Sequence, residues 1–294
     1  MKVGILGQKD NKTTLKYIHI LVEELLKCST TILFEKNIYD YFIQKYPAYT
    51  FDTFTGYSDL DRSCDMFYSV GGDGTFLRSV SFVRDLNIPI IGINTGTLGF
   101  LANVQKEQIS EAVNQINQGA YIIKKRSLLR VEASEKNADL EEINFALNEV
   151  AITRKYTASM ITVETYLDDE FLTTYWSDGL IISTPTGSTG YSLSCGGPII
   201  SPNSKNFVLT PVAPHSLGVR PLVIPETTKI ELHVGSRSKE AVLTLDSRIT
   251  TISNTTKLLI RKCDFHIRTL HLNNQTFIKT LREKLLWGQD KRNN

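Results

Sequence analysis

Residues 69–77 read Ser69-Val70-Gly71-Gly72-Asp73-Gly74-Thr75-Phe76-Leu77, in which an apolar strand runs into a glycine-rich turn and then into a helix. The same alternation continues on both sides of this segment. Short apolar runs lie at 3–6, 30–34, 66–70 and 88–94, and apolar residues fall at helical spacing over 13–27, 75–86 and 106–118. Strand–helix alternation of this kind predicts an α/β fold with an open, mainly parallel sheet covered by helices.

The texture of the sequence changes after Ala120. Short segments rich in Val, Ile, Thr and Tyr then predict strands within 121–133, 143–154, 160–176, 179–184, 207–213, 229–235, 241–246 and 256–272. Helical spacing returns over 276–287. We therefore expect an α/β domain over 1–119, a mostly β domain over 120–274, and a C-terminal helix within 275–294 that packs back on the first domain.

The composition excludes several classes of protein. With 294 residues, 41% of them hydrophobic and 22% charged, the chain has the profile of a globular protein of one large domain or two ordinary ones. A formal charge of +2 gives no overall field that would select nucleic acid or an anionic membrane, and no run approaches the ~20 apolar residues of a membrane span. Four scattered cysteines argue against a disulfide framework and indicate a reducing cytoplasm. The charge run 124–126 is expected to be solvated.

The glycine-rich turn is the strongest candidate for a site. Its three glycines allow the backbone to approach a ligand closely, and the start of the next helix offers unpaired N–H groups to a phosphate. Two tasks suit the carboxylate of Asp73 there: holding a divalent metal ion, or accepting a proton from an attacking hydroxyl. The turn is neither a GxxxxGK[ST] loop nor a GxGxxG fingerprint. Arg78 is the nearest cation, although a solvated helix surface explains it equally well.

Polar residues also interrupt other apolar runs. The run 178–184 leads into Ser188-Thr189-Gly190-Tyr191-Ser192-Leu193-Ser194, which suits sugar hydroxyls and phosphates or forms an ordinary loop. Asn148 and Glu149 are adjacent within an apolar strand, so at least one of them faces the core or a site. Phe100 ends the run 94–100 and either packs in the core or stacks on an aromatic ligand.

The remaining conspicuous residues have ordinary explanations. His233 and the other histidines in strand-like runs lack metal-ligand spacing and are expected to be fold residues. The sequence contains no GxSxG elbow, so a hydrolase triad is not expected.

Together and in this order, the motifs resemble those of the NAD kinase family. The resemblance covers nearly the whole chain through GGDGTFL (71–77), NTGTLGF (94–100), NE (148–149), DGLIISTPTGSTGYSLSCGGP (178–198) and APHSLGVRPLVIP (213–225). The first motif alone is shared with lipid kinases and 6-phosphofructokinase, whereas the 178–198 segment is far more specific. The resemblance implies an ATP-dependent phosphotransferase that converts NAD to NADP by phosphorylating the 2′-hydroxyl of its adenosine ribose. It also implies an N-terminal α/β domain and a C-terminal β domain with NAD bound between them.

The resemblance further implies roles for single residues. Asp73 takes the proton from the ribose hydroxyl, and the ATP phosphates lie against Gly71, Gly72, Gly74 and Thr75. Phe100 lies near the adenine of NAD, Asn148 and Glu149 hydrogen-bond ribose hydroxyls, and Asp178 lies near the nicotinamide end. The rest of the NAD set is Gly74, Arg78, Thr189, Gly190, Tyr191, Ser192, Leu193, Ser194, Ala213 and Arg248. A divalent cation, Mg²⁺, is required, with ligands that the motifs leave unknown, and members of the family form homodimers or homotetramers.

Two alternatives and three departures stay open. A lipid kinase of the diacylglycerol or sphingosine type shares the GGDG turn but needs an apolar cleft or membrane-binding surface, for which the sequence gives no amphipathic apolar segment. A non-catalytic dinucleotide-binding protein is the other alternative, and the acidic residue at 73 argues against it.

The sequence departs from the family pattern at three places. Gly190 stands where many members have alanine, Trp176 where a basic residue is common, and Ser247-Arg248 where Gly-Gln is frequent.

Overall fold

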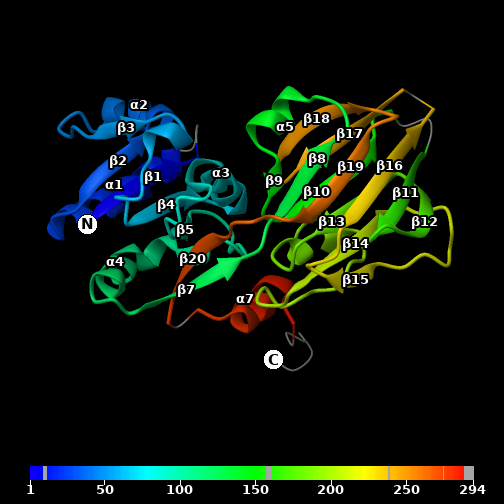
Figure 1. Cartoon of the computed structure of the whole chain (residues 1–294). Coiled ribbons are helices and arrows are strands. Elements are labelled where there is room, and N and C mark those ends of the chain that lie inside the picture. The colour runs from blue at the N-terminus through cyan, green and yellow to red at the C-terminus, as the bar shows by residue number, and fades with distance from the viewer. Residues whose placement is uncertain (9–11, 157–159, 238, 274, 288–294) are drawn as a thin grey trace. The chain divides into compact units, whose positions relative to one another are not determined.

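A computed structural model describes residues 1–8, 12–156, 160–237, 239–273 and 275–287. The chain divides into two units, one formed by Met1–Lys125 with the chain from Ile267 onwards, and the other by Arg126–His266. Figure 1 labels most of the helices and strands of both units.

The first unit is built on an eight-stranded sheet. Its order is β3-β2-β1-β4-β5-β20-β7, with β6 paired to β5, and the pairs from β3 to β20 are parallel. The strands are β1 (Lys2–Gly7), β2 (Thr31–Glu35), β3 (Asp52–Phe54), β4 (Met66–Gly71), β5 (Ile90–Asn94), β6 (Val104–Gln105), β7 (Tyr121–Arg126) and β20 (Ile267–Leu272). Every residue of β4 and β5 is buried, which explains why these central strands read as continuous apolar runs.

The described residues of the first unit form five α-helices. They are α1 (Lys12–Lys27), α2 (Lys36–Lys45), α3 (Asp73–Val83), α4 (Ile109–Asn117) and α7 (Phe277–Leu285). In α1, the buried residues Ile18, Leu21, Val22 and Leu25 recur at helical spacing and form one apolar stripe. The helix α3 packs on β4 and β5, and this contact fixes the turn between β4 and α3.

The second unit contains two six-stranded antiparallel sheets. Their orders are β15-β14-β13-β10-β17-β18 and β12-β11-β16-β19-β8-β9. The strands are β8 (Leu129–Ala133), β9 (Phe145–Ala146), β10 (Glu149–Arg154), β11 (Ile161–Leu167), β12 (Glu170–Ser177), β13 (Gly179–Ser183), β14 (Asn206–Val212), β15 (Leu222–Pro225), β16 (Ile230–Ser236), β17 (Glu240–Leu245), β18 (Arg248–Ser253) and β19 (Lys257–Lys262). One apolar core contains residues of both sheets, such as Val150 and Val163. Two short helices, α5 (Ala138–Glu142) and α6 (Tyr191–Ser194), complete the unit.

The architecture confirms the predicted fold class, with a parallel-sheet α/β unit, a mostly antiparallel β unit, and a C-terminal helix belonging to the first. The division of the chain differs from the expected ranges 1–119 and 120–274. The strands β7 and β20 both belong to the sheet of the first unit, so the chain passes to the second unit after residue 125 and returns at residue 267.

Several local features also differ from the sequence-based expectations. The helix α3 begins at Asp73 rather than near Thr75, which brings the carboxylate into its first turn. The helix α2 and the strands β3, β15 and β18 were not predicted. Within the charge run 124–126, Arg126 is buried and donates to the carbonyl of Pro202 at 3.0 Å, so this guanidinium is not solvated. Burial lowers the pKa of Arg126 to about 10.

Candidate functional site

The carboxylate of Asp73 lies at the point where β4 ends and α3 begins. Its Oδ2 accepts the backbone N–H of Phe100 at 2.9 Å, and its Oδ1 accepts those of Leu101 and Ala102 at 3.1 and 3.0 Å. A carboxylate offers about four lone-pair positions, two on each oxygen. Oδ1 is therefore fully used, whereas Oδ2 retains one position for a further donor.

The loop after β5 is shaped to supply these three N–H groups. The Asn94 side chain donates to the carbonyls of Thr97 and Ala102 and accepts the N–H of Gly96, which fixes the loop from within. A Cβ on Gly99 would lie 2.0 Å from Asp73 Oδ1, so only glycine at this place allows the carboxylate to reach the loop. From the sequence, this loop was expected to be the polar end of a strand and a family motif, without a contact to Asp73.

The glycines of the turn differ in what surrounds them. A Cβ on Gly71 would lie 2.3 Å from Thr75 Oγ1, so packing of β4 against α3 requires glycine there. A Cβ on Gly72 or Gly74 would meet no described atom within 4 Å. Internal packing therefore does not account for these two glycines, and the open backbone beside Asp73 leaves room for a ligand at the positive end of the helix. Arg78 lies on α3 and is partly exposed.

Phe100 is partly exposed and contacts the C-terminal helix. Lys284 of α7 donates to the carbonyl of Leu98 at 2.9 Å, and its ammonium lies 5.3 Å from the centre of the Phe100 ring. The ring of Phe277, also on α7, has its centre 6.4 Å from that of Phe100. The helix α7 thus holds the same loop that binds the Asp73 carboxylate.

In the second unit, Asn148 and Glu149 lie at the start of β10 beside the backbone of Gly190. A Cβ on Gly190 would lie 2.9 Å from Glu149 Oε2 and 3.6 Å from Asn148 Nδ2. Glu149 Oε2 and Asn148 Oδ1 are buried and have no hydrogen-bond partner among the described residues. Buried polar atoms are nearly always paired, so these two atoms are the ones expected to meet a polar ligand.

Burial raises the pKa of Glu149 to about 8, and the nearby Asp246 carboxyl acts in the same direction, whereas the backbone N–H of Tyr191 opposes them. Glu149 is only 9% exposed. At neutral pH this carboxyl is therefore mostly protonated, and it can donate a hydrogen bond as well as accept one. A protonated carboxyl suits a ligand hydroxyl, which also donates and accepts.

Most hydroxyls of the segment 184–194 serve the fold. Ser188 Oγ donates to the carbonyl of Pro185 and accepts the N–H of Ile200, and Ser192 Oγ lies 2.8 Å from Thr210 Oγ1. Both serines are fully buried. The density of hydroxyl residues therefore does not translate into a row of exposed hydroxyls. Within this segment, Tyr191 and Ser194 are exposed, and Thr189, Gly190 and Leu193 are intermediate.

Three further candidates lie at the margins of the second unit's sheets. Asp178, between β12 and β13, forms an ion pair of 2.8 Å with Arg154. Burial raises the pKa of Tyr191, and the charges of Cys195, Asp178 and Glu149 add to that shift, so these groups lie within electrostatic reach of one another.

Ala213 follows β14 with a left-handed φ of 45°, a conformation that alanine adopts at a cost of about 1–2 kcal/mol. Arg248 opens β18, where its side chain donates to the carbonyls of Leu245 and Phe145.

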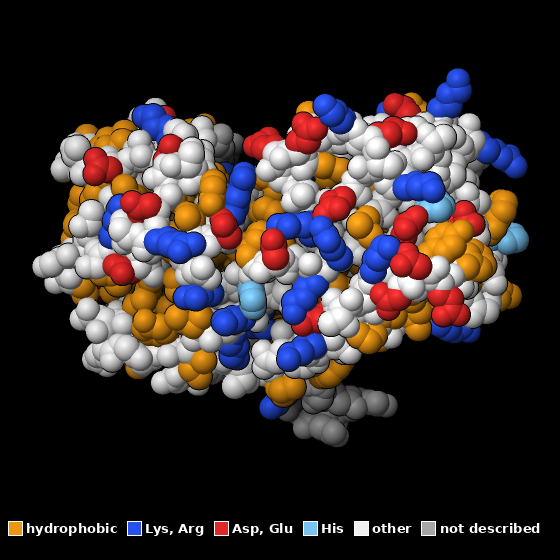
Figure 2. Space-filling model, viewed as in Figure 1, with side chains coloured by type: hydrophobic (Ala, Val, Ile, Leu, Met, Phe, Trp, Pro, Cys, Tyr) orange, Lys and Arg blue, Asp and Glu red, His pale blue; other side chains and the backbone are white. Residues whose placement is uncertain are grey.

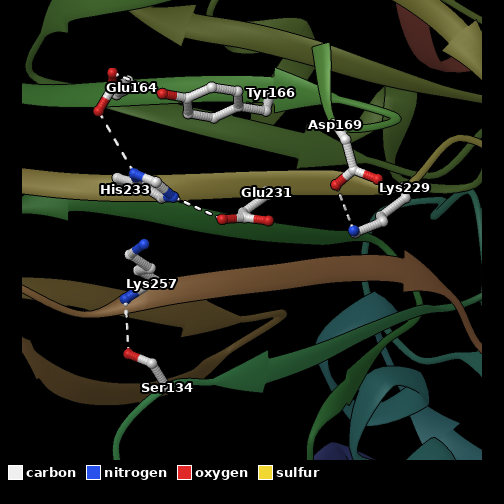
Figure 3. Close-up of polar contacts among 8 residues, drawn as sticks. All are labelled: Ser134, Glu164, Tyr166, Asp169, Lys229, Glu231, His233 and Lys257. Carbon is white, nitrogen blue, oxygen red and sulfur yellow. Dashed lines mark hydrogen bonds and ion pairs between the residues drawn. The ribbon is translucent and has the colours of Figure 1, made fainter. Parts of the chain in front are cut away.

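His233 belongs to an ion-pair network on the outer face of the sheet, apart from these candidates. Its two ring nitrogens face Glu231 at 2.7 Å and Glu164 at 3.5 Å, as Figure 3 shows. This placement agrees with the expectation that His233 is a fold residue. Among the described residues, no group of three or more His, Cys, Asp or Glu side chains is arranged to hold a metal ion.

The distribution of surface charge and the length and polarity of the helices are relevant to nucleic-acid and membrane partners. Figure 2 shows Lys and Arg side chains interspersed with Asp and Glu side chains on the visible face of the second unit. None of the described helices is both long enough and apolar enough to cross a membrane.

Comparison with known families gives matches to both halves of the chain. The family described as the ATP-NAD kinase N-terminal domain matches residues 3–121, and the ATP-NAD kinase C-terminal domain matches residues 147–272. The chain belongs to the NAD kinase family. A curated relative, the NAD kinase of Christiangramia forsetii, is 47% identical over 298 residues, which cover 100% of both chains.

Solved structures of NAD kinases have the same fold. The crystal structure of an NAD kinase from Archaeoglobus fulgidus in complex with ATP matches with a TM-score of 0.72 and 25% identity, covering 96% of this chain and 99% of that one. The crystal structure of yeast NADH kinase complexed with NADH matches with a TM-score of 0.86 at 22% identity, covering 99% of this chain and 89% of that one. The yeast likeness concerns the fold alone.

Membership of the NAD kinase family agrees with the resemblance drawn from the motifs. The sequence did not point to two further residues, Lys284 and Asp246, which contact segments that contain these motifs. Lys284 lies far from the loop in sequence, and a lysine on a C-terminal helix carries no signal of its own. Asp246 accepts the backbone N–H groups of 147–149, yet in the sequence it marks only a turn between two strands. Both residues act through backbone groups of distant segments, which a motif does not display.

Proposed function

We propose that this protein transfers the γ-phosphoryl group of ATP to the 2′-hydroxyl of the adenosine ribose of NAD, giving NADP and ADP. Membership of the NAD kinase family supports the activity. The observation that assigns this activity to a particular group is the position of the Asp73 carboxylate. Three backbone N–H groups hold it beside the open glycines of the turn.

Asp73 acts on the acceptor hydroxyl. The free position on Oδ2 accepts the hydrogen bond of the ribose 2′-OH and orients its oxygen towards the γ-phosphorus. As the new O–P bond forms, the proton passes to Oδ2 while the bond between the γ-phosphorus and its bridging oxygen breaks, and ADP leaves. Phosphoryl transfer depends mainly on alignment and charge neutralisation, so a carboxylate held by three N–H groups supplies the alignment.

The phosphates of ATP bind at Gly71, Gly72, Gly74 and Thr75. The open backbone at Gly72 and Gly74 supports a close approach, and the positive end of α3 favours negative charge. Mg²⁺ carried by the ATP phosphates would neutralise charge at the transferring group. A cation held largely by substrate phosphates fits the described residues, which offer Asp73 at this place but no cluster of ligands.

We assign NAD recognition to the residues that the family resemblance implies. Asn148 Oδ1 and Glu149 Oε2, which are buried and unpartnered among the described residues, bind ribose hydroxyls. Phe100 lies against the adenine, and Asp178 lies near the nicotinamide end. The remaining NAD residues that we assign are Gly74, Arg78, Thr189, Gly190, Tyr191, Ser192, Leu193, Ser194, Ala213 and Arg248.

The proposal is tested by incubating the purified protein with ATP, Mg²⁺ and NAD, and in parallel with diacylglycerol or sphingosine in place of NAD. We expect NADP and ADP in equal amounts and no phosphorylated lipid. Phosphorylated lipid without NADP would indicate the lipid kinase. Binding of NAD in calorimetry without either product would indicate a dinucleotide-binding protein without catalysis.

We also propose that the protein acts in the cytoplasm in NADP biosynthesis, as a homodimer or homotetramer without nucleic acid or membrane partners. The scattered cysteines support the first point, and the family resemblance supports the second. Light scattering coupled to size-exclusion chromatography measures the assembly directly, and a monomeric mass at the assay concentration would contradict it.

A further inference from the structure

Asp246 lies in the two-residue turn between β17 and β18, and its carboxylate points back at the start of β10. Oδ2 accepts the N–H of Leu147 at 2.9 Å, and Oδ1 accepts those of Asn148 and Glu149 at 2.7 and 3.3 Å. The side chain is only 4% exposed. Three consecutive N–H groups therefore converge on one buried carboxylate.

The carbonyls of the same three residues are also bound. Thr184 Oγ1 donates to the carbonyl of Leu147 at 2.6 Å, and the N–H of Thr184 donates to that of Asn148 at 2.9 Å. The N–H of Asp246 donates to the carbonyl of Glu149 at 2.9 Å. All six backbone N–H and C=O groups of 147–149 are therefore hydrogen-bonded to Asp246 or Thr184, four of them to Asp246.

We propose that Asp246 is a positioning residue for NAD: its carboxylate fixes the backbone of 147–149 so that the side chains of Asn148 and Glu149 meet the ribose hydroxyls. This inference rests on the proposed function, because it takes the NAD-binding role of Asn148 and Glu149 from there. Asp246 itself is turned to the backbone and does not touch the reacting atoms.

The arrangement also sets the charge beside the substrate. Burial raises the pKa of Asp246, while the N–H groups of 147–149 and the guanidinium of Arg248, 3.7 Å away, favour its ionised form. Glu149 receives one backbone N–H, from Tyr191. The ionised form of Asp246, which the three N–H groups and the guanidinium favour, raises the pKa of Glu149. Tyr191 is a further titratable group here, and the charges of Cys195, Asp178 and Glu149 all raise its pKa.

The test uses Asp246→Asn, because asparagine tolerates the left-handed φ of 55° at this position. Its amide keeps one acceptor oxygen but turns an NH₂ group towards backbone donors. We expect the KM for NAD to rise about tenfold or more, which corresponds to losing one or two hydrogen bonds to a charged group. The KM for ATP is expected to stay within about twofold, because the ATP residues lie in the first unit.

A pH profile separates positioning from a general loss of structure. Removing the negative charge of Asp246 lowers the pKa of Glu149, so the midpoint in the pH dependence of kcat/KM for NAD that Glu149 controls moves to lower pH. Hydrogen exchange gives a readout that does not need activity: the amides of 147–149 are expected to exchange faster in Asp246→Asn while those of β13 and β14 stay unchanged.

The matched control is Asp169→Asn. Asp169 also has a left-handed φ, of 69°, in a β-turn of the second unit, but its exposed carboxylate faces Lys229 at 2.6 Å (Figure 3). This variant is expected to keep the parental KM for NAD and pH profile.

The outcomes separate this inference from the proposed function. Failure of the parental protein to form NADP would overturn the proposed function and, with it, the role assigned to Asp246. If the parental protein forms NADP, an unchanged KM for NAD in Asp246→Asn would overturn only the positioning role. Faster exchange of 147–149 with an unchanged KM would also overturn it, because the contact would then serve the fold alone.

Discussion

The carboxylate of Asp73 accepts the backbone N–H of Phe100 at 2.9 Å, across 27 residues of sequence. The N–H groups of Leu101 and Ala102 bind the same carboxylate. The group assigned to proton transfer and the ring assigned to the adenine therefore belong to one hydrogen-bonded arrangement. A change that moves either one should disturb both chemistry and nucleotide binding.

Replacing Gly99 by alanine should disrupt this arrangement. The new Cβ would lie 2.0 Å from Asp73 Oδ1, so the carboxylate or the loop has to move. We expect kcat with NAD to fall by on the order of 10²-fold, because the acceptor oxygen leaves its aligned position, and the free energy of unfolding to fall by about 1–3 kcal/mol. Steady-state kinetics and urea unfolding measure the two effects.

Gly96→Ala is the matched control on the same loop. Only Asn94 Oδ1, at 3.9 Å, lies near a Cβ at that position, and neither glycine has a left-handed φ. This variant should keep activity within about twofold. Equal losses in both variants would show that the loop tolerates no alanine, and that the contact with Asp73 is not the cause.

Lys284→Met should weaken the support that α7 gives to the loop. The variant loses the hydrogen bond to the carbonyl of Leu98 and the cation over the Phe100 ring. Lys284 is exposed, so we expect only about a two- to fivefold rise in the KM for NAD, equivalent to a loss of about 0.5–1 kcal/mol. Lys284→Arg should recover most of the parental value, and Lys279→Met on the same helix should have no effect. A parental KM in Lys284→Met would contradict the role given to this contact.

The buried carboxyl of Glu149 should make folding stability depend on pH. Its pKa is about 8 in the folded protein, against 4.5 as its ordinary value. Between these values the folded state holds a proton that the unfolded state has released, so the stabilisation is present below about pH 4.5 and is lost as pH rises through 8. The slope contributed by Glu149 is at most about 1.4 kcal/mol per pH unit.

The measurement compares thermal unfolding of the parental protein and Glu149→Gln between pH 5 and pH 8. Glutamine keeps the shape without titrating, so the stability of the variant should fall less with rising pH. The exposed Glu170→Gln serves as the control and should follow the parental curve. Parallel curves for the parental protein and Glu149→Gln would contradict the raised pKa.

Elements with a strong apolar pattern could be predicted from the sequence. The helix predicted over 13–27 corresponds to α1, the run at 66–70 lies within β4, and the run at 88–94 contains β5, because buried stripes and buried strands are visible as spacing. The helix α2 buries only Ile38 and Phe42, and β18 buries one residue, so neither gives a clear period. Their positions depend on tertiary contacts.

The residues that we assign to ligand contacts were easier to single out from the sequence than those that support them. The GGDG turn and the Asn148-Glu149 pair combine residue types that an ordinary core does not need, and this gave a signal. The partners of Asp246 lie 97 to 99 residues away, so its part in the site depends on the folded register of β10 and β17. Ser192 is a different case, because its hydroxyl suggests a ligand group in the sequence but lies 2.8 Å from Thr210 Oγ1 inside the fold.

Asp73→Asn separates proton transfer from nucleotide binding when NAD binding and turnover are each measured on the same preparation. The amide oxygen can still accept the N–H groups of Leu101 and Ala102, whereas the NH₂ group faces the backbone N–H of Phe100, so that two donors meet. We therefore expect the free energy of unfolding to fall by about 1–3 kcal/mol. Asp59→Asn is the matched control, because this exposed carboxylate also accepts backbone N–H groups of a loop in the same unit.

We expect Asp73→Asn to bind NAD with a Kd within about tenfold of the parental value, while kcat for NADP formation falls on the order of 10²-fold or more. The Asp59→Asn control should retain both values. Parental turnover in Asp73→Asn, at saturating NAD and ATP and below its unfolding temperature, would contradict the assignment of proton transfer to this carboxylate.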